Sequence, residues 1–304
     1  MKSIGVIGNG YVGSAIAEGF KHYTDVKVYD KDPKRSANEL DEVLKQEFVF
    51  ICVPTPMLKN QNGKCDLKII EDTFNEINKI KSKSILIIKS TIPIGTTSRL
   101  QSNFPQLTIL HSPEFLTART SRIDFITPSR TIVGYPKEFY SNLHYAPSEA
   151  LKLFEDRFPG SNCILMNSEE SETAKYTANC FFATKVSFFN EIKLLSDKLN
   201  CDFNKIMSGV LTDGRIGVSH YQVPGHDGKM GFGGTCFPKD INALINIMKD
   251  HGISPNVLEG AWRTNIKVRP EKDWENSPSA VSDLEDFFDP EHGSDVSGCG
   301  HDHT

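Results

Sequence analysis

One cysteine lies where it could act as a nucleophile. Cys236 follows the glycine-rich run 231–235, and Pro238 comes next at a position typical of the first turn of a helix. A cysteine at a helix N-terminus faces the positive end of the helix dipole, which favours the reactive thiolate. Asp240 lies four residues after the cysteine and returns to the same helix face. The structural alternative is a glycine-rich turn beside a buried, inert thiol.

Two further polar residues share one face of another predicted helix. Lys175 and Asn179 are four residues apart in a segment, 168–199, that contains neither glycine nor proline. A lysine ammonium and an amide N–H are both suited to stabilising an oxyanion. The alternative is a solvated surface lysine beside a polar neighbour.

The first 30 residues predict a dinucleotide site. A short strand over 2–8 leads into the motif Gly8-Asn9-Gly10-Tyr11-Val12-Gly13, and a helix follows over 14–20. In this motif the glycines permit a tight turn, a close approach of pyrophosphate, and close packing of helix on strand. A second strand over 26–29 ends at Asp30, which would accept a hydrogen bond from a ribose 2′-hydroxyl and repel a 2′-phosphate. The pattern therefore favours NAD over NADP.

The elements that must position these groups change in type along the chain. Strands are expected over 48–53, 84–88, 107–110, 130–134 and 163–165, with a helix over 67–81. From Ser168 onwards only helices are expected, over 168–199, 203–211, 239–251 and 254–267. This order predicts an α/β protein with a Rossmann-type, doubly wound parallel sheet in residues 1–167 and an all-helical central, dimerisation domain in residues 168–270. Ligands of such sheets bind at the carboxyl ends of the strands.

The remaining segment, 271–304, is rich in Ser, Asp, Glu, Gly and Pro and predicts a disordered acidic tail. Its Cys299, His301 and His303 could ligate a metal, but a structural zinc site needs four ordered ligands, so no metal site is expected.

Composition narrows the class of protein further. The formal net charge of −5 provides no basic surface for nucleic acid. The sequence contains no apolar run long enough to span a membrane and no signal-peptide pattern. Seven scattered cysteines without an export signal indicate reduced thiols, so we expect a cytoplasmic protein.

In their order along the chain, these motifs resemble the UDP-glucose/GDP-mannose dehydrogenase family. The resemblance covers roughly residues 1–270 and is carried by 8–13, 53–56, 90–96, 113–116, 175–179, 213–217 and 231–240. It implies that a primary alcohol is oxidised to a carboxylate in two hydride transfers to NAD. Cys236 would hold the intermediate as a thiohemiacetal and then as a thioester. UDP-glucose is the expected substrate, with GDP-mannose or another UDP-sugar as the alternative.

The resemblance also assigns roles to individual residues. Catalytic roles fall to Cys236, Lys175, Asn179, Asp240, Glu114 and Thr91. Cofactor binding falls to Gly8, Asn9, Gly10, Tyr11, Val12, Gly13, Asp30, Arg35, Pro54, Thr55, Thr91 and Lys239. Substrate binding falls to Phe115, Leu116, Thr117, Lys175, Asn179, Arg215, Tyr221, Gly233 and Gly234. A homodimer through the central helices is expected, with Arg215 reaching across its interface.

The chain departs from the family in two places. Ala118 stands where the family usually has a second glutamate. The family's C-terminal α/β domain, which helps to hold the nucleotide, is expected to be missing, so that either the nucleotide would bind weakly or a partner would complete its site. Two other functions therefore stay open: a truncated, non-catalytic relative that binds NAD and a partner subunit, and a single-step hydroxyacid dehydrogenase, which would not need Cys236.

Overall fold

The structure is a computed structural model that describes residues 2–59, 61–117, 119–277 and 279–282. Its N-terminal half is built on a seven-stranded sheet with the strand order β2-β1-β3-β5-β6-β7-β8. The strands are β1 (Ile4–Ile7), β2 (Val26–Tyr29), β3 (Phe48–Ile51), β5 (Ile85–Ile88), β6 (Thr108–His111), β7 (Arg130–Tyr135) and β8 (Asn162–Asn167).

The strands from β2 to β6 are all parallel, and β7 is parallel to β8, but β6 and β7 are antiparallel. The predicted parallel sheet is thus confirmed except at this junction. The cause is the connection after β6, because the guanidinium of Arg130 at the start of β7 lies 3.8 Å from the ring of Phe115, just beyond the end of β6. The chain enters β7 at the carboxyl edge of the sheet and must run back along it.

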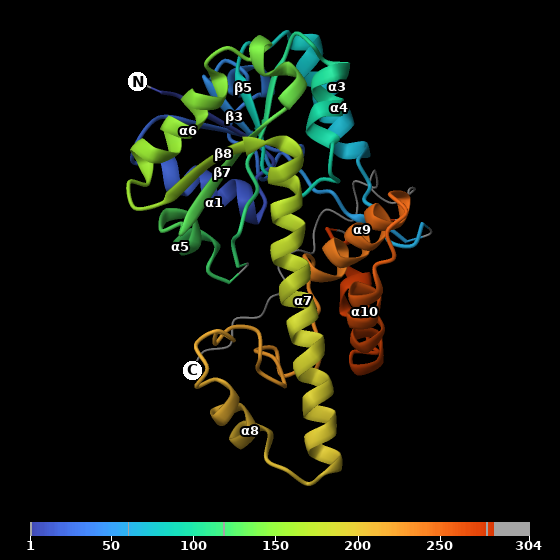
Figure 1. The fold of residues 1–304 in the computed structure, drawn as a ribbon. Coiled ribbons are helices and arrows are strands. Elements are labelled where there is room, and N and C mark those ends of the chain that lie inside the picture. The colour runs from blue at the N-terminus through green and yellow to red at the C-terminus, as the bar shows by residue number, and fades with distance from the viewer. Residues whose placement is uncertain (1, 60, 118, 278, 283–304) are drawn as a thin grey trace.

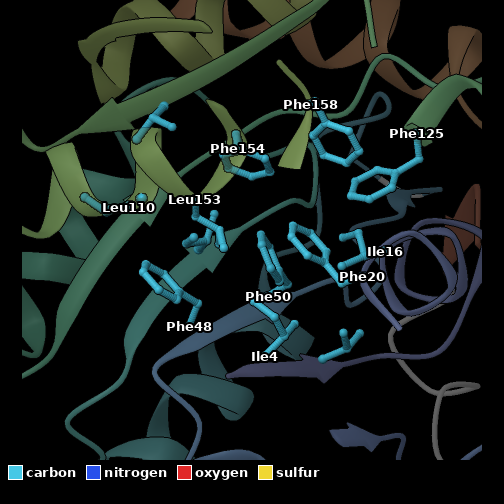
Figure 2. Close-up of a cluster of buried hydrophobic side chains, with 14 of the residues drawn as sticks. Ile4, Ile16, Phe20, Phe48, Phe50, Leu110, Phe125, Leu153, Phe154 and Phe158 are labelled. Carbon is cyan, nitrogen blue, oxygen red and sulfur yellow. The ribbon is translucent and has the colours of Figure 1, made fainter. Parts of the chain in front are cut away.

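Two layers of helices bury the sheet. One face is covered by α1 (Tyr11–Phe20), α5 (Ser121–Ile126) and α6 (Ala146–Arg157), whose phenylalanines pack closely. Figure 2 shows Phe20, Phe125, Phe154 and Phe158 gathered over Phe50 of β3. The other face is covered by α2 (Leu40–Val43), α3 (Lys68–Ile80) and α4 (Thr96–Asn103). A 3-10 helix, η1 (Lys137–Asn142), precedes α6.

The helix α7 (Ser168–Lys198) joins the sheet to the helical part of the chain (Figure 1). It starts directly after β8. Its N-terminal cap is Asn167. The Asn167 side chain accepts a hydrogen bond from the Glu170 N–H, and the Glu170 carboxylate accepts one from the Asn167 N–H, both at 2.9 Å.

The other helices pack against α7 at two levels. At the end of α7 next to the sheet, α9 (Phe237–Asp250) and α10 (Asn256–Val268) lie along α7. Cys180 and Ala183 of α7 pack there with Ile241 and Ile245 of α9. Near the far end, α8 (Phe203–Val210) packs Phe203 and Met207 against Phe189.

The start of the segment predicted to be a disordered tail is ordered, so that boundary was wrong. Residues 273–276 form a 3-10 helix, η2 (Asp273–Asn276), and β9 (Val281–Ser282) pairs in parallel with β4 (Met57–Leu58). Trp274 is 2% exposed and packs with Met57 and Ala280. Composition averaged over 271–304 hid these few apolar side chains, which bury against a loop of the sheet domain. Residues 283–304, with Cys299, His301 and His303, lie outside the described residues.

Within the described ranges, no helix is long and apolar enough to cross a membrane.

Candidate active site

The glycine motif after β1 has the geometry of a dinucleotide site. Gly8 has a φ of +92°, and a Cβ there would lie 2.7 Å from the Cys52 carbonyl oxygen. A Cβ on Gly13 would lie 1.8 Å from the Gly8 carbonyl oxygen, so the first turn of α1 can pack on β1 only with glycine there. A Cβ on Gly10 would meet nothing within 4 Å, which leaves the side from which a pyrophosphate would approach open.

Three residues predicted to bind cofactor come together at the end of β2. The Asp30 carboxylate accepts hydrogen bonds from the backbone N–H of Asn9 at 2.6 Å and of Asp32 at 2.9 Å. The Asn9 amide donates to the Arg35 carbonyl oxygen at 2.8 Å. This arrangement places an acid beside the glycine motif, where a ribose hydroxyl of a bound NAD would need an acceptor.

The neighbouring strand ends are joined in the same way. The Thr55 hydroxyl, beyond β3, donates to the Thr91 carbonyl oxygen, beyond β5, at 2.7 Å. Ser90 donates to the Val53 carbonyl oxygen at 2.6 Å. Pro54, Thr55 and Thr91 therefore lie together at the carboxyl edge of the sheet, as predicted for a ligand-binding edge.

A network of buried charges connects α7 to that edge and to α9. Lys175 is 3% exposed, and its ammonium donates to the carboxylate of Glu114 at 2.8 Å and to the carbonyl oxygen of Glu114 at 2.7 Å. The Asn179 amide donates to the carboxylate of Asp240 at 2.6 Å, and Lys239 forms an ion pair with the other oxygen of that carboxylate. The alternative of a solvated Lys175 is thus excluded.

Cys236 lies at the N-terminus of α9, with Pro238 in the first turn, as predicted. The pKa of its thiol, however, is above the ordinary value. Protein atoms that crowd the sulfur desolvate it, although part of the residue remains exposed, and the carboxylates of Glu114 and Asp240 oppose a further negative charge. Lys175 and Lys239 act in the other direction without outweighing these effects. The prediction that this position favours the thiolate is therefore wrong.

Both lysines of the network stay charged. Burial opposes the charged form of Lys175, but Glu114 and Asp240 outweigh burial and raise its pKa above the ordinary value. The same balance, with Asp240 as the main partner, raises the pKa of Lys239. The ammonium of Lys239 is bound to Asp240, and its predicted role in cofactor binding stays a prediction.

The segment after β6 places Phe115 beside the network. The centroid of the Phe115 ring lies 3.8 Å from the Arg130 guanidinium and 5.6 Å from the Lys175 ammonium. The Glu114 carboxylate accepts the Leu116 N–H at 2.7 Å, and Thr117 is tied to Asp124. Arg130 escaped the sequence analysis because nothing in its local pattern separates it from an ordinary strand residue.

Lys89 was also missed. It is 4% exposed at the end of β5 and donates to the Ser112 hydroxyl at 3.1 Å and the Pro113 carbonyl oxygen at 3.2 Å. Burial lowers its pKa to about 8. Lys89 supports the backbone just before Glu114. The signal for it in the sequence was a lysine directly after an apolar strand.

Other predicted substrate residues lie apart from the network. Arg215 has an 89% exposed side chain and pairs with Asp213 at 2.5 Å. Tyr221 packs against Phe189 with ring centroids 6.4 Å apart. Gly233 and Gly234 lie just before Cys236 in the sequence, where Gly233 packs against Arg269 and Asp273 and the Gly234 N–H donates to Asp273 at 3.4 Å. Ala118 lies outside the described residues.

The nucleotide-binding sheet and the buried polar network beside its carboxyl edge define an NAD-dependent oxidoreductase. Residues 35–145 match the model of the UDP-glucose/GDP-mannose dehydrogenase family, NAD binding domain, and residues 169–267 match the model of the central domain of the same family. The chain belongs to this family.

Individual relatives agree with this assignment. The chain is 31% identical to a UDP-glucose 6-dehydrogenase of Rickettsia typhi over 88% of its own length and 67% of that protein. It is 29% identical to the UDP-glucose 6-dehydrogenase TuaD of Bacillus subtilis, of which it spans 64%. Among solved structures, a UDP-glucose dehydrogenase from Pyrobaculum islandicum superimposes with a TM-score of 0.77 at 26% identity, covering 91% of this chain and 71% of that one.

A 3-hydroxyisobutyrate dehydrogenase of Mycobacterium tuberculosis, at 14% identity and a TM-score of 0.66, shares the fold alone.

Proposed function

We propose that the protein oxidises the 6-hydroxymethyl group of UDP-glucose to a carboxylate in two hydride transfers. The observation that carries the proposal is that Lys175, Asn179 and Asp240 form one buried network around Cys236 at the carboxyl edge of the nucleotide-binding sheet. The substrate is inferred from the relatives named UDP-glucose 6-dehydrogenase.

The first step converts the alcohol to an aldehyde. Bound NAD supplies the acceptor for the hydride, and the hydroxyl proton passes to a carboxylate of the network, Asp240 or Glu114. The charged ammonium of Lys175 and the amide N–H of Asn179 stabilise the alkoxide that forms as the proton leaves. Because these donors are already fixed by hydrogen bonds, little reorganisation is needed.

The second step keeps the aldehyde bound. The Cys236 sulfur adds to the carbonyl carbon as the thiol proton passes to a neighbouring carboxylate, which gives the oxyanion of a thiohemiacetal. Removal of a second hydride, for which a second bound NAD would be the acceptor, would convert this adduct on Cys236 to a thioester. A water molecule positioned near Thr91 then cleaves the carbon–sulfur bond and restores the thiol. The sum is one alcohol, two NAD and one water giving one carboxylate, two NADH and three protons.

A raised thiol pKa suits this sequence of steps. The resting thiol is neutral, so Cys236 becomes a nucleophile only when an adjacent carboxylate accepts its proton at the moment of attack.

We also propose that two copies of the chain associate through α7. Phe181, Phe188 and Leu195 are spaced seven residues apart on this helix and are 64%, 54% and 54% exposed, which is the spacing of a helix–helix seam. An open groove of about 770 Å³ runs from Phe115 and Arg130 to Phe181. A second copy on this seam would lie beside the predicted substrate residues, where its exposed Arg215 is expected to reach.

The test is a panel of UDP- and GDP-sugars assayed by NADH formation. UDP-glucose is expected to give two NADH per molecule, and Cys236→Ser is expected to reduce net oxidation to background. The matched control is Cys201→Ser, which changes an exposed cysteine between α7 and α8. Oxidation of GDP-mannose and not of UDP-glucose would mean that GDP-mannose is the substrate. One NADH per substrate molecule would favour single-step chemistry. NADH from no sugar, alone or with a full-length relative added, would contradict the proposal.

A further inference from the structure

We propose that Arg269, with Asp227 and Asp273, forms an ionic clamp that positions the glycine-rich loop 231–235 and thereby Cys236. These three are positioning residues, and the role given to Cys236 rests on the proposed function. Arg269 ends α10, Asp273 begins η2, and Asp227 lies in the loop before the glycines.

Arg269 is the centre of the clamp. It is 3% exposed, and its guanidinium donates to Asp227 at 2.7 Å and to both carboxylate oxygens of Asp273 at 2.6 and 3.0 Å. It also donates to the Met230 carbonyl oxygen at 3.3 Å, directly before the glycine-rich loop. A planar, forked cation holds two carboxylates and a backbone oxygen in one geometry, which a lysine could not do.

The loop itself is bound through its backbone. Its N–H groups at 231, 232 and 234 donate to Asn190 at 2.9 Å, Asn265 at 2.7 Å and Asp273 at 3.4 Å. Asn265 also donates to the Phe232 carbonyl oxygen at 2.9 Å. Asp273 therefore bonds at once to Arg269 and to the loop two residues before Cys236.

The glycines make room for this clamp. A Cβ on Gly233 would lie 2.5 Å from the Arg269 guanidinium and from both carboxylate oxygens of Asp273. A Cβ on Gly231 would lie 2.4 Å from the Asn265 side-chain oxygen. The missing side chain of Gly233 is what lets the clamp approach the backbone, and its predicted contact with substrate stays a prediction.

Arg269 keeps the two carboxylates of the clamp charged although both are partly buried. Burial alone would raise the pKa of Asp273, but the hydrogen bond and charge of Arg269 hold it below its ordinary value, and Asp227 shows the same balance. Removing the guanidinium would leave two partly buried carboxylates facing each other, which should push the loop away from α10.

The clamp is anchored on the sheet domain. Asp273 directly precedes the buried Trp274, and the same segment ends in β9, which pairs with β4 in the loop after β3. Arg269 and Asp273 lie beyond residue 267, where the match to the family's central domain ends. The segment that follows α10 thus connects the cofactor-binding half to the loop that carries Cys236.

The test combines hydrogen–deuterium exchange with steady-state kinetics on Arg269→Met, Asp273→Asn and Asp227→Asn. We expect the amides of 231–235 to exchange about tenfold faster, while those of the β5 core stay unchanged. The turnover number should fall about tenfold or more at an unchanged dissociation constant for NAD. Arg269→Lys, which keeps the charge but loses the fork, should fall between the wild type and Arg269→Met.

The matched control is Glu271→Gln. It breaks the ion pair of Lys229 and Glu271 at 3.4 Å, which joins the same two segments but is exposed, and should change neither measurement. If Arg269→Met does not fold, the two Asp→Asn variants carry the test. Unchanged exchange at 231–235 in those variants would overturn the clamp, whatever the enzyme oxidises. Faster exchange with no activity on any sugar would retain the clamp and contradict the proposed function.

Discussion

At the scale of single residues, burial and the carboxylates around Cys236 both oppose the thiolate form of its sulfur. Glu114 and Asp240 both raise the pKa of the thiol, whereas Lys175 and Lys239 are each paired with one of these carboxylates. The positive charges of the two lysines are therefore offset by the two carboxylates. Removing one carboxylate should leave one lysine charge available to stabilise the thiolate.

Asp240→Asn is expected to lower the pKa of the Cys236 thiol. The variant removes a carboxylate that opposes the thiolate and frees the charge of Lys239, and both effects have the same sign. When the pH is below the pKa of a thiol, each unit by which that pKa falls raises the thiolate fraction about tenfold. Alkylation of Cys236 by iodoacetamide at pH 8 should therefore accelerate by about threefold to tenfold.

The measurement is best made in a Cys201→Ser background, which removes an exposed thiol. Asp213→Asn, which removes a carboxylate that pairs with the exposed Arg215, serves as the control and should leave the rate unchanged. A slower reaction in Asp240→Asn would show that Asp240 activates the thiol in the resting protein.

At the scale of elements, α7 and α4 are joined by one buried carboxylate. Glu172 is 1% exposed and accepts the N–H groups of Gly95 at 2.5 Å and Thr97 at 2.9 Å, as well as the Thr97 hydroxyl at 2.6 Å. It thus caps the N-terminus of α4 from a different part of the chain. Because the loop before α4 contains Thr91, this cap fixes Thr91 relative to Lys175 one turn along α7.

Glu172→Gln is expected to change how stability depends on pH. Burial raises the pKa of Glu172 from 4.5 to about 7 against the effect of its hydrogen bonds. The folded state therefore keeps a proton that the unfolded chain releases between these values. The resulting stabilisation is complete below pH 4.5 and is lost as pH rises to about 7.

Urea unfolding at several pH values measures this effect. The free energy of unfolding of the wild type should fall relative to Glu172→Gln by up to about 3 kcal/mol between pH 4.5 and 7. Glu191→Gln, an exposed carboxylate change on the same helix, should track the wild type. A wild type that gains stability relative to Glu172→Gln over this range would mean that the hydrogen bonds, not burial, dominate.

At the scale of the whole molecule, the exposed seam of α7 should decide assembly. Phe181→Glu combined with Phe188→Glu places two charges in the proposed interface and is expected to convert a dimer into a monomer, as measured by light scattering after gel filtration. Tyr145→Glu, at an 82% exposed aromatic residue before α6, is the matched control and should remain dimeric. A wild-type monomer at micromolar concentration would contradict the proposed dimer.

Local patterns predicted much of this fold. The turn at Gly8, the acid at Asp30 and the helix that starts beside Cys236 depend on residues close in sequence, and the structure confirms their local geometry. The antiparallel entry of β7 was missed because it depends on where the chain travels after β6, which no strand pattern encodes.

The contacts that build the candidate site were less predictable. Lys175 meets Glu114 and Asn179 meets Asp240 across 61 residues in each case, and spacing along one helix cannot reveal such a partner. Asp273 was overlooked because it lies where composition suggested a tail, and Arg269 because nothing in its local pattern separates it from an ordinary residue at a helix end. The direction of the pKa shift at Cys236 depends first on burial and then on Glu114 and Asp240, of which Glu114 is distant in the sequence.

The length of α7 has a mechanical consequence. Its 31 residues make one continuous helix about 46 Å long. Glu172, Lys175 and Asn179 all lie in its first twelve residues, whereas Phe188 and Leu195 of the exposed seam lie in the remainder. The proposed chemistry and the proposed association of copies therefore use successive lengths of one helix, so changes at its far end should alter association while the near end keeps its polar side chains in place.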